Sequence, residues 1–204
     1  MVIDNIEKFI YENNIKMIYL DWDGVITHSV KAIVDILNKK HNININPQDI
    51  VSWNFKEADP TLTDEEMELL FTTKEFFFEL EYIDGVIDFM KRHRNNIIIV
   101  TKAKTENYLG KIHMLKRIGL DDIPIIPIPL NMSKSIINMY YHNLDNYLDY
   151  SLFIDDSTNN LLESSAPFKI QFREYNDDKE REWQKDWNGY VMYKWTWQLY
   201  YFMI

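Results

Sequence analysis

IYLDWDGV, residues Ile18 to Val25, is the stretch that decides the fold class. It contains the end of a compact apolar run, Lys16 to Leu20, and the residues Asp21, Trp22, Asp23 and Gly24 that follow this run directly. A run this short, followed at once by glycine, is typical of a buried strand that emerges into a loop. The stretch therefore predicts a strand that delivers two aspartates at its carboxyl end.

Further apolar runs repeat this pattern and alternate with helical periods. Strands are expected at residues 96–100, 125–128, 151–154 and 168–172. Helices are expected at residues 3–14, 29–40, 63–70, 74–80, 86–92, 105–118 and 133–141. Strands that are apolar on both faces and alternate with helices indicate a mostly parallel sheet covered by helices. The fold class is therefore α/β.

Polar residues follow three of these strands. Asp21 and Asp23 follow the first, Thr101 the second, and Asp155 with Asp156 a later one. The ligand crevice of an open parallel sheet lies outside the carboxyl ends of its strands, so these side chains are expected to converge. Four carboxylates would repel one another unless a cation lies among them. Hard oxygen ligands suit Mg²⁺, so the pattern indicates a metal-assisted phosphate site.

Each of these residues also has a simpler interpretation. Asp155 and Asp156 suit the N-cap region of a following helix equally well. Thr101 suits an ordinary strand-end hydroxyl, and Lys134, which could supply positive charge, suits a solvated surface lysine. Because each follows an apolar run in the order that one site would require, the combination favours the functional interpretation.

Composition limits the classes of function. The 204 residues suffice for one α/β domain with an inserted subdomain. Lys+Arg number 22 and Asp+Glu 32, and the net charge of −10 argues against duplex nucleic acid as a partner. The absence of cysteine excludes disulfides and fits a cytoplasmic setting. We find neither a signal-peptide pattern nor an apolar run of the roughly 20 residues that a membrane span needs.

Four short motifs resemble those of the haloacid dehalogenase-like (HAD) phosphatases. They are IYLDWDGV, the IIIVT run of residues 97–101, Lys134, and FIDDS of residues 153–157. The resemblance implies a Rossmann-like core domain made of residues 1–26 and 84–204. It also implies a small helical cap of the C1 type, residues 27–83, inserted after the first strand.

The resemblance also implies roles for single residues. Asp21 would be the nucleophile that forms an aspartyl-phosphate, and Asp23 the general acid and base. Dehalogenases of the superfamily typically lack that second aspartate, so Asp23 favours phosphate esters. Thr101 would bind the transferring phosphoryl group, and Lys134 would hold the charges of nucleophile and phosphate together. The implied Mg²⁺ ligands are Asp21, Asp23 through its carbonyl, Asp155 and Asp156, with Asp155 expected as the direct ligand of the acidic pair.

The segment FFFELEYIDGVIDFM, residues 76–90, and the small helical cap are similar to the 5′(3′)-deoxyribonucleotidase branch. A nucleotide substrate would need an aromatic surface for its base. The candidates are Trp53, Phe55 and residues 76–78, and the alternative is that these rings form the core of the cap. Lys102 departs from the small hydroxyl residue expected there, and it either adds charge for phosphate or marks a different substrate.

Other functions remain open from the sequence. One alternative keeps the chemistry and changes the substrate to a sugar phosphate or a polynucleotide 3′-phosphate. Another is a non-catalytic binding protein on a HAD scaffold, although every implied catalytic side chain is present. The tryptophan-rich C-terminal part is expected to pack on the core or to form a homodimer contact, so both a monomer and a homodimer remain possible.

Overall fold

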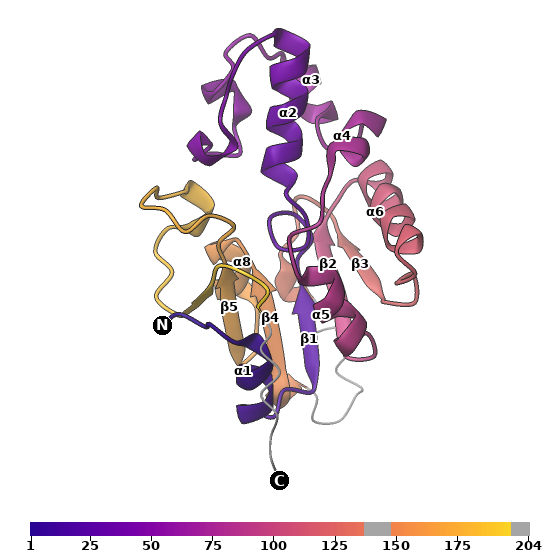
Figure 1. The fold of residues 1–204 in the computed structure, drawn as a ribbon, viewed down its shortest axis with the longest axis vertical. Helices are drawn as coiled ribbons and strands as arrows, with labels where there is room; N and C mark the ends of the chain where they lie inside the picture. Colours follow the sequence, from indigo (N-terminus) through magenta and orange to yellow (C-terminus); the bar gives the residue numbers. More distant parts are fainter. Residues whose placement is uncertain (137–147, 197–204) are drawn as a thin grey trace.

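The computed structural model describes residues 1–136 and 148–196 and shows a parallel sheet flanked by helices (Figure 1). The six strands are β1 Met17–Leu20, β2 Ile97–Lys102, β3 Ile125–Ile128, β4 Ser151–Asp155, β5 Phe168–Phe172 and β6 Tyr190–Met192. Their order is β3-β2-β1-β4-β5-β6, and every neighbouring pair is parallel. The predicted α/β class and the five predicted strands are confirmed.

Strand β1 lies in the middle of the sheet, between β2 and β4. Its last residue, Leu20, is in register with Ile99 of β2 and Ile154 of β4. The three strands therefore end at one edge, and the residues that follow them come together there. Ile18, Tyr19 and Leu20 are all buried, which explains why the strand is apolar on both faces.

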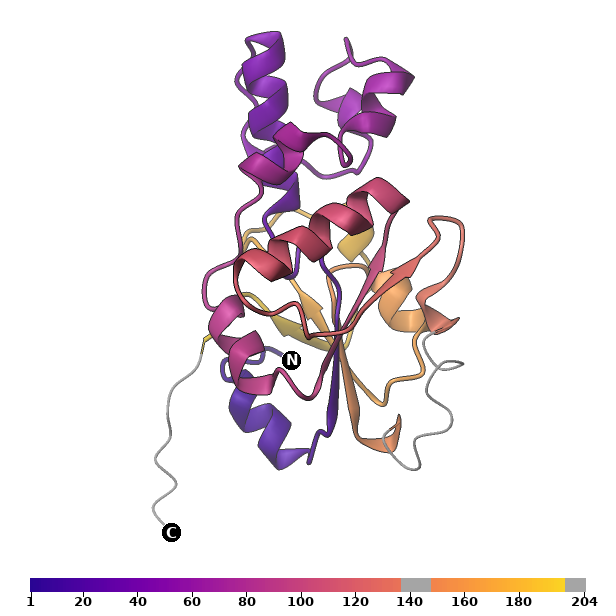
Figure 2. The same cartoon turned by 90° about the vertical axis from the view of Figure 1, so that its right-hand side faces the viewer.

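Helices cover both faces of the sheet (Figure 2). The helices are α1 Ile6–Glu12, α2 Ser29–His41, α3 Asp64–Leu69, α4 Lys74–Glu79, α5 Val86–His93, α6 Thr105–Arg117 and α8 Thr158–Glu163. The larger apolar core joins α1, α5 and α6 to the face that carries Ile18 and Ile99. A smaller core joins α8 to the opposite face, with Tyr19 and Val100. Alternate residues of each strand thus pack on opposite layers.

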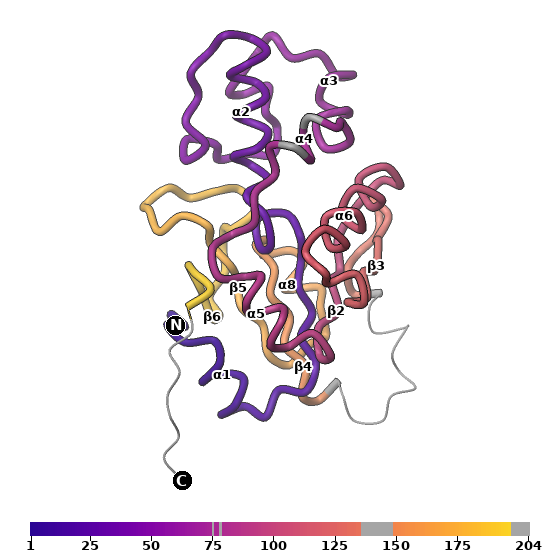
Figure 3. Tube along the Cα trace, turned by 45° about the vertical axis from the view of Figure 1, so that its right-hand side comes forward, coloured from indigo at the N-terminus to yellow at the C-terminus, as the bar shows by residue number. Residues whose placement is uncertain are grey.

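Residues 27–83, called here the inserted segment, lie beyond the carboxyl edge of the sheet (Figures 1 and 3). They contain α2, α3, α4 and the 3₁₀ turns η1 Pro47–Asp49 and η2 Phe55–Glu57. Thr63 and Glu66 form a capping box, and these hydrogen bonds fix the start of α3. Phe55 and Phe76 are 0% exposed and belong to the larger apolar core, which continues from the sheet into the inserted segment.

Three local features differ from the expectations or extend them. Of the helix expected at 133–141, Lys134–Ile136 form the 3₁₀ turn η3, and residues 137–147 lie outside the described part. Further 3₁₀ turns are η4 Leu148–Tyr150 and η5 Glu182–Gln184. Strand β6 was not expected. Trp195 packs against Phe89 and Phe172, with ring centroids 4.6 and 5.6 Å away, whereas Trp197 lies outside the described residues.

Among the described residues, no helix has the length and apolarity that crossing a bilayer would demand.

Candidate functional site

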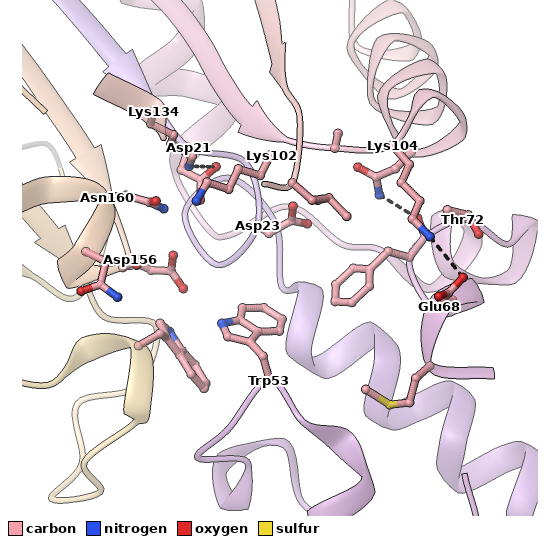
Figure 4. A pocket seen from close by; sticks show the side chains of 18 residues that line it. Asp21, Asp23, Trp53, Glu68, Thr72, Lys102, Lys104, Lys134, Asp156 and Asn160 are labelled. Atoms are coloured by element: carbon pink, nitrogen blue, oxygen red, sulfur yellow. Dashed lines mark hydrogen bonds and ion pairs between the residues drawn. The ribbon is translucent and has the colours of Figure 1, made fainter. Parts of the chain in front are cut away.

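A cavity of about 730 Å³ lies between the carboxyl edge of the sheet and the inserted segment (Figure 4). Six of the residues singled out in the sequence line it: Asp21, Asp23, Trp53, Lys102, Lys134 and Asp156. Thr101 and Asp155 are completely buried beside it. The parallel sheet therefore brings the four predicted motifs together at one place, as the strand-end argument required.

Lys134 joins the first and last motifs. Its Nζ lies 2.7 Å from Asp21 Oδ1 and 2.7 Å from Asp155 Oδ2. Asp155 also accepts hydrogen bonds from the Ser157 backbone N–H at 2.8 Å and from Asn160 Nδ2 at 3.0 Å. Lys134 is 1% exposed, so it is a buried ion-pair partner and not a solvated surface lysine.

Burial makes the ionised forms of Asp21 and Asp156 unfavourable unless a further cation is bound. Burial raises the pKa of Asp21 to about 7, and the charges of Asp155 and Asp23 add to this while Lys134 opposes it. Burial likewise raises the pKa of Asp156 well above its ordinary value, and the charges of Asp155 and Asp21 add to the effect. Burial would lower the pKa of Lys134, but Asp155 and Asp21 outweigh it and raise that pKa.

This donor set fits a hard divalent cation. Carboxylate oxygens of Asp21, Asp155 and Asp156 all lie within 4.8 Å of one another. Both oxygens of Asp155 already accept hydrogen bonds. Asp156 lines the cavity, and no residue in the described ranges donates a hydrogen bond to its carboxylate. Asp155 and Asp156 therefore both remain candidate ligands, and the hydrogen bonds to Asp155 favour Asp156 for the direct contact.

Gly24 lets the first motif approach Asp156. Its φ is +73°, a left-handed conformation that strains any residue with a Cβ. A Cβ at this position would stand 2.7 Å from Asp156 Oδ2. The loop after β1 therefore needs glycine for its backbone conformation and also to leave room for a carboxylate of the site.

Asp23 is held from two sides. Its Oδ1 accepts a hydrogen bond from Ser29 Oγ at 2.7 Å, and its Oδ2 pairs with Lys111 Nζ at 2.6 Å. Lys111 also donates to Thr101 Oγ1 at 2.7 Å. The sequence reasoning missed Lys111, a residue of α6 that is 0% exposed. A signal existed, because Asn107, Lys111 and the apolar Met114 and Leu115 share the buried stripe of that helix.

The aromatic candidates have separate positions. Trp53 lines the cavity, and its ring centroid lies 5.0 Å from that of Trp183, which lines the cavity from the core side. Phe55 and Phe76 are completely buried and do not line the cavity, a position that favours the alternative in which these rings form a core. The side chain of Phe78 lies outside the described part. The sequence predicts no role for Trp183, because no local motif or periodicity distinguishes this residue.

The inserted segment contacts the core on two sides of the cavity. On one side, Lys104 Nζ pairs with Glu68 at 3.6 Å (Figure 4). Asn107 Nδ2 also donates to the Phe71 carbonyl at 2.6 Å. On the other, the Glu182 backbone N–H donates to the Val51 carbonyl at 2.8 Å. The cavity is therefore bounded by both parts of the chain.

At the base of the inserted segment, His28 lies beside α2, and its Nδ1 is 2.7 Å from Glu174 Oε1. The residue thus binds the core and does not line the cavity.

Solved structures share this fold at low sequence identity. A HAD family hydrolase from Deinococcus radiodurans with bound phosphate and sodium has a TM-score of 0.64 at 10% identity, covering 88% of this chain and 91% of that one. A HAD-superfamily hydrolase, subfamily IA, from Geobacter sulfurreducens has a TM-score of 0.57 at 12% identity, covering 88% and 92%. The protein YfnB of Bacillus subtilis, solved with magnesium, has a TM-score of 0.55 at 15% identity, covering 89% and 95%.

None of the curated protein sequences matches this chain. A family model does match it, over residues 13–192, and that model is described as 5′ nucleotidase, deoxy (Pyrimidine), cytosolic type C protein. The matched range contains all four motifs and the whole inserted segment. The chain therefore belongs to this 5′ nucleotidase family of HAD-like phosphoric monoester hydrolases.

Proposed function

We propose that this protein is a Mg²⁺-dependent hydrolase of nucleoside monophosphates that works through an aspartyl-phosphate on Asp21. The observation that carries the proposal is the separation of two carboxylates at the end of β1. Asp21 pairs with Lys134 at 2.7 Å, while Asp23 is held by Ser29 at 2.7 Å and Lys111 at 2.6 Å. Two carboxylates with different partners suit two different roles.

Asp21 and Asp156 would hold the Mg²⁺ ion, with the backbone carbonyl of Asp23, and Asp155 would support them through Lys134. When bound, the ion would neutralise phosphoryl oxygens and favour the ionised form of Asp21, whose pKa is raised to about 7 without it. Magnesium in the structure of YfnB and phosphate in the Deinococcus hydrolase support such a site on this fold.

In the first step, Asp21 Oδ2 attacks the phosphorus, because Oδ1 is engaged by Lys134. The bond from phosphorus to the ester oxygen breaks, and Asp23 gives its proton to that oxygen as the alcohol leaves. Lys134 stays beside the nucleophile and offsets the charge that gathers there. The products of this step are the free alcohol and the phosphorylated Asp21.

In the second step, Asp23 accepts a proton from water while the water oxygen attacks the phosphorus. The bond between phosphorus and Asp21 breaks, inorganic phosphate leaves, and the carboxylate of Asp21 is restored. Asp23 is protonated again, so the cycle closes without any other reagent. A single carboxylate acts as acid and then as base, as microscopic reversibility requires.

The cavity supports a nucleotide over a smaller ester. Its volume of about 730 Å³ lies within the usual range of ligand sites, and Trp53, Phe71 and Trp183 give it an aromatic wall. A nucleobase can stack on such a wall. The family description, which names deoxy and pyrimidine nucleotides and the cytosol, supports the same substrate class and a cytoplasmic location. We assign residues 27–83 the role of a substrate-selecting cap on the core of residues 1–26 and 84–204.

The test is phosphate release from ribo- and deoxyribonucleoside 5′- and 3′-monophosphates, with sugar phosphates alongside, in Mg²⁺ and in EDTA. We expect Mg²⁺-dependent turnover concentrated on deoxynucleotides, and its loss in Asp21→Asn with the fold retained. The matched control is Asp88→Asn, which removes a carboxylate from α5 on the core side and should keep full activity. Turnover spread over sugar phosphates would reassign the substrate, and activity in Asp21→Asn would overturn the mechanism.

A further inference from the structure

Lys111 is a fully buried lysine in the middle of α6. Its side chain is 0% exposed, and its Nζ contacts Asp23 Oδ2 at 2.6 Å and Thr101 Oγ1 at 2.7 Å. Moving an ammonium group out of water is costly unless a partner compensates for it. An apolar residue on this stripe, beside Met114 and Leu115, would pack the core without that cost. The lysine is therefore not explained by packing alone.

The two contacts fix one carboxylate relative to the sheet. Asp23 follows β1, whereas Thr101 belongs to β2, and Lys111 of α6 bridges them. Ser29, at the start of α2, holds the other oxygen of Asp23. A carboxylate with a partner on each oxygen, both of them buried, has few rotamers open to it.

We infer that Lys111 is a positioning residue: it holds Asp23 Oδ2, so that Oδ1, beside the Ser29 hydroxyl, carries the proton that passes to the leaving oxygen. This inference rests on the proposed phosphatase function, and it adds a residue outside the four motifs to that reaction. It places Lys111 in the proton-transfer step and not in the neutralisation of phosphate. The basicity of the leaving group distinguishes a role in proton transfer from a role in neutralising the phosphate.

The experiment compares two esters. An alkyl phosphate such as a nucleoside 5′-monophosphate releases a strongly basic alkoxide, which needs a proton from Asp23. The p-nitrophenolate of p-nitrophenyl phosphate is a weak base and leaves without one. A lysine that acts through the general acid matters for the first ester and little for the second, whereas a lysine that binds phosphate matters equally for both.

The variants are Lys111→Met, Asp23→Asn as the benchmark, and Lys116→Met as the control from the exposed side of the same helix. General acid catalysis contributes about 10²–10⁴-fold, so we expect Lys111→Met to lower kcat/KM for the nucleotide by about 10²-fold or more. We expect less than a tenth of that loss with p-nitrophenyl phosphate, and the same asymmetry in Asp23→Asn. Lys116→Met should match the wild type on both esters.

Circular dichroism and the thermal midpoint would show that each variant is folded. If Lys111→Met is not folded at the assay temperature, Lys111→Gln, which keeps a hydrogen-bond donor, replaces it with the same expected asymmetry. Equal losses on both esters, or no loss, in a folded variant would overturn the role of Lys111 and leave the phosphatase proposal standing. A wild type that hydrolyses neither ester in Mg²⁺ would instead overturn the proposed function, and this inference with it.

Discussion

At the scale of single residues, the charge state of Asp21 connects the site to stability. Its pKa is raised from 3.8 to about 7 in the folded protein, chiefly by burial. A carboxyl group whose pKa is higher in the folded state stabilises the protein below its unfolded pKa. That contribution is lost as the pH rises through the folded pKa. For Asp21, this contribution to stability is lost between about pH 4 and about pH 7 when no cation offsets the charge.

Asp21→Asn should therefore stabilise the metal-free protein at pH 8, by up to the order of 4 kcal/mol, with the gain shrinking towards pH 5. Thermal unfolding in EDTA at the two pH values measures this difference. Mg²⁺ should raise the midpoint of the wild type more at pH 8 than at pH 5, because it offsets the same charge. A variant that is less stable than the wild type in EDTA at pH 8 would show that the pair with Lys134 outweighs burial.

Two glycines provide a matched pair for the metal site. Gly24 and Gly119 have φ values of +73° and +70°, but a Cβ at Gly24 would meet Asp156, whereas a Cβ at Gly119 would meet nothing within 4 Å. Alanine at either position should cost about 1–2 kcal/mol of stability from the left-handed backbone. Only Gly24→Ala should also raise the Mg²⁺ concentration that gives half-maximal activity. Equal Mg²⁺ dependence in the two variants would place Asp156 outside the metal site.

At the scale of elements, most strands and helices could be predicted from the apolar runs and the helical periods of the sequence. The bounds of the strands at 125–128 and 168–172 agree with the prediction, because the first is a short apolar run and the second alternates Phe168, Ile170 and Phe172 with polar residues. Tyr190–Met192 escaped notice, since a three-residue edge strand has too little pattern of its own and exists through its pairing with β5. Lys111 and Trp183 escaped notice for a related reason. A charged residue on an apolar stripe, or a tryptophan in a long connection, acquires its partner only when the tertiary fold is formed.

Trp183 offers a test of the connection between β5 and β6. This connection reaches the inserted segment through the Glu182 backbone bond to Val51 and supplies one wall of the cavity. Stacking of a base on an aromatic side chain is worth roughly 1–3 kcal/mol, so Trp183→Ala should raise KM for nucleotides by about 5- to 150-fold. The kcat/KM for p-nitrophenyl phosphate should change far less. A similar loss on both substrates would indicate that Trp183 supports the inserted segment and does not contact the base.

At the scale of the whole molecule, an acidic protein places three lysines in a cavity that four carboxylates also line. The net charge is −10, yet Lys102, Lys104 and Lys134 line one cavity, and Lys111 lies buried beside it. A small phosphate ester that enters the cavity meets these lysines at close range. A longer polyanion would instead extend over the acidic surface, where like charges repel over roughly 10 Å at 0.1 M salt.

The molecule should therefore discriminate between thymidine 3′-monophosphate and the same 3′-phosphate at the end of a six-residue oligothymidylate. We expect kcat/KM for the oligomer to be lower by about 10²-fold at low salt, because unfavourable like-charge placement costs several kcal/mol. Contact between the inserted segment and the core also leaves the longer chain little room. Raising the salt screens the repulsion, so the gap should narrow without closing. Equal turnover of the two esters at all salt concentrations would make polynucleotide ends the better candidate substrate.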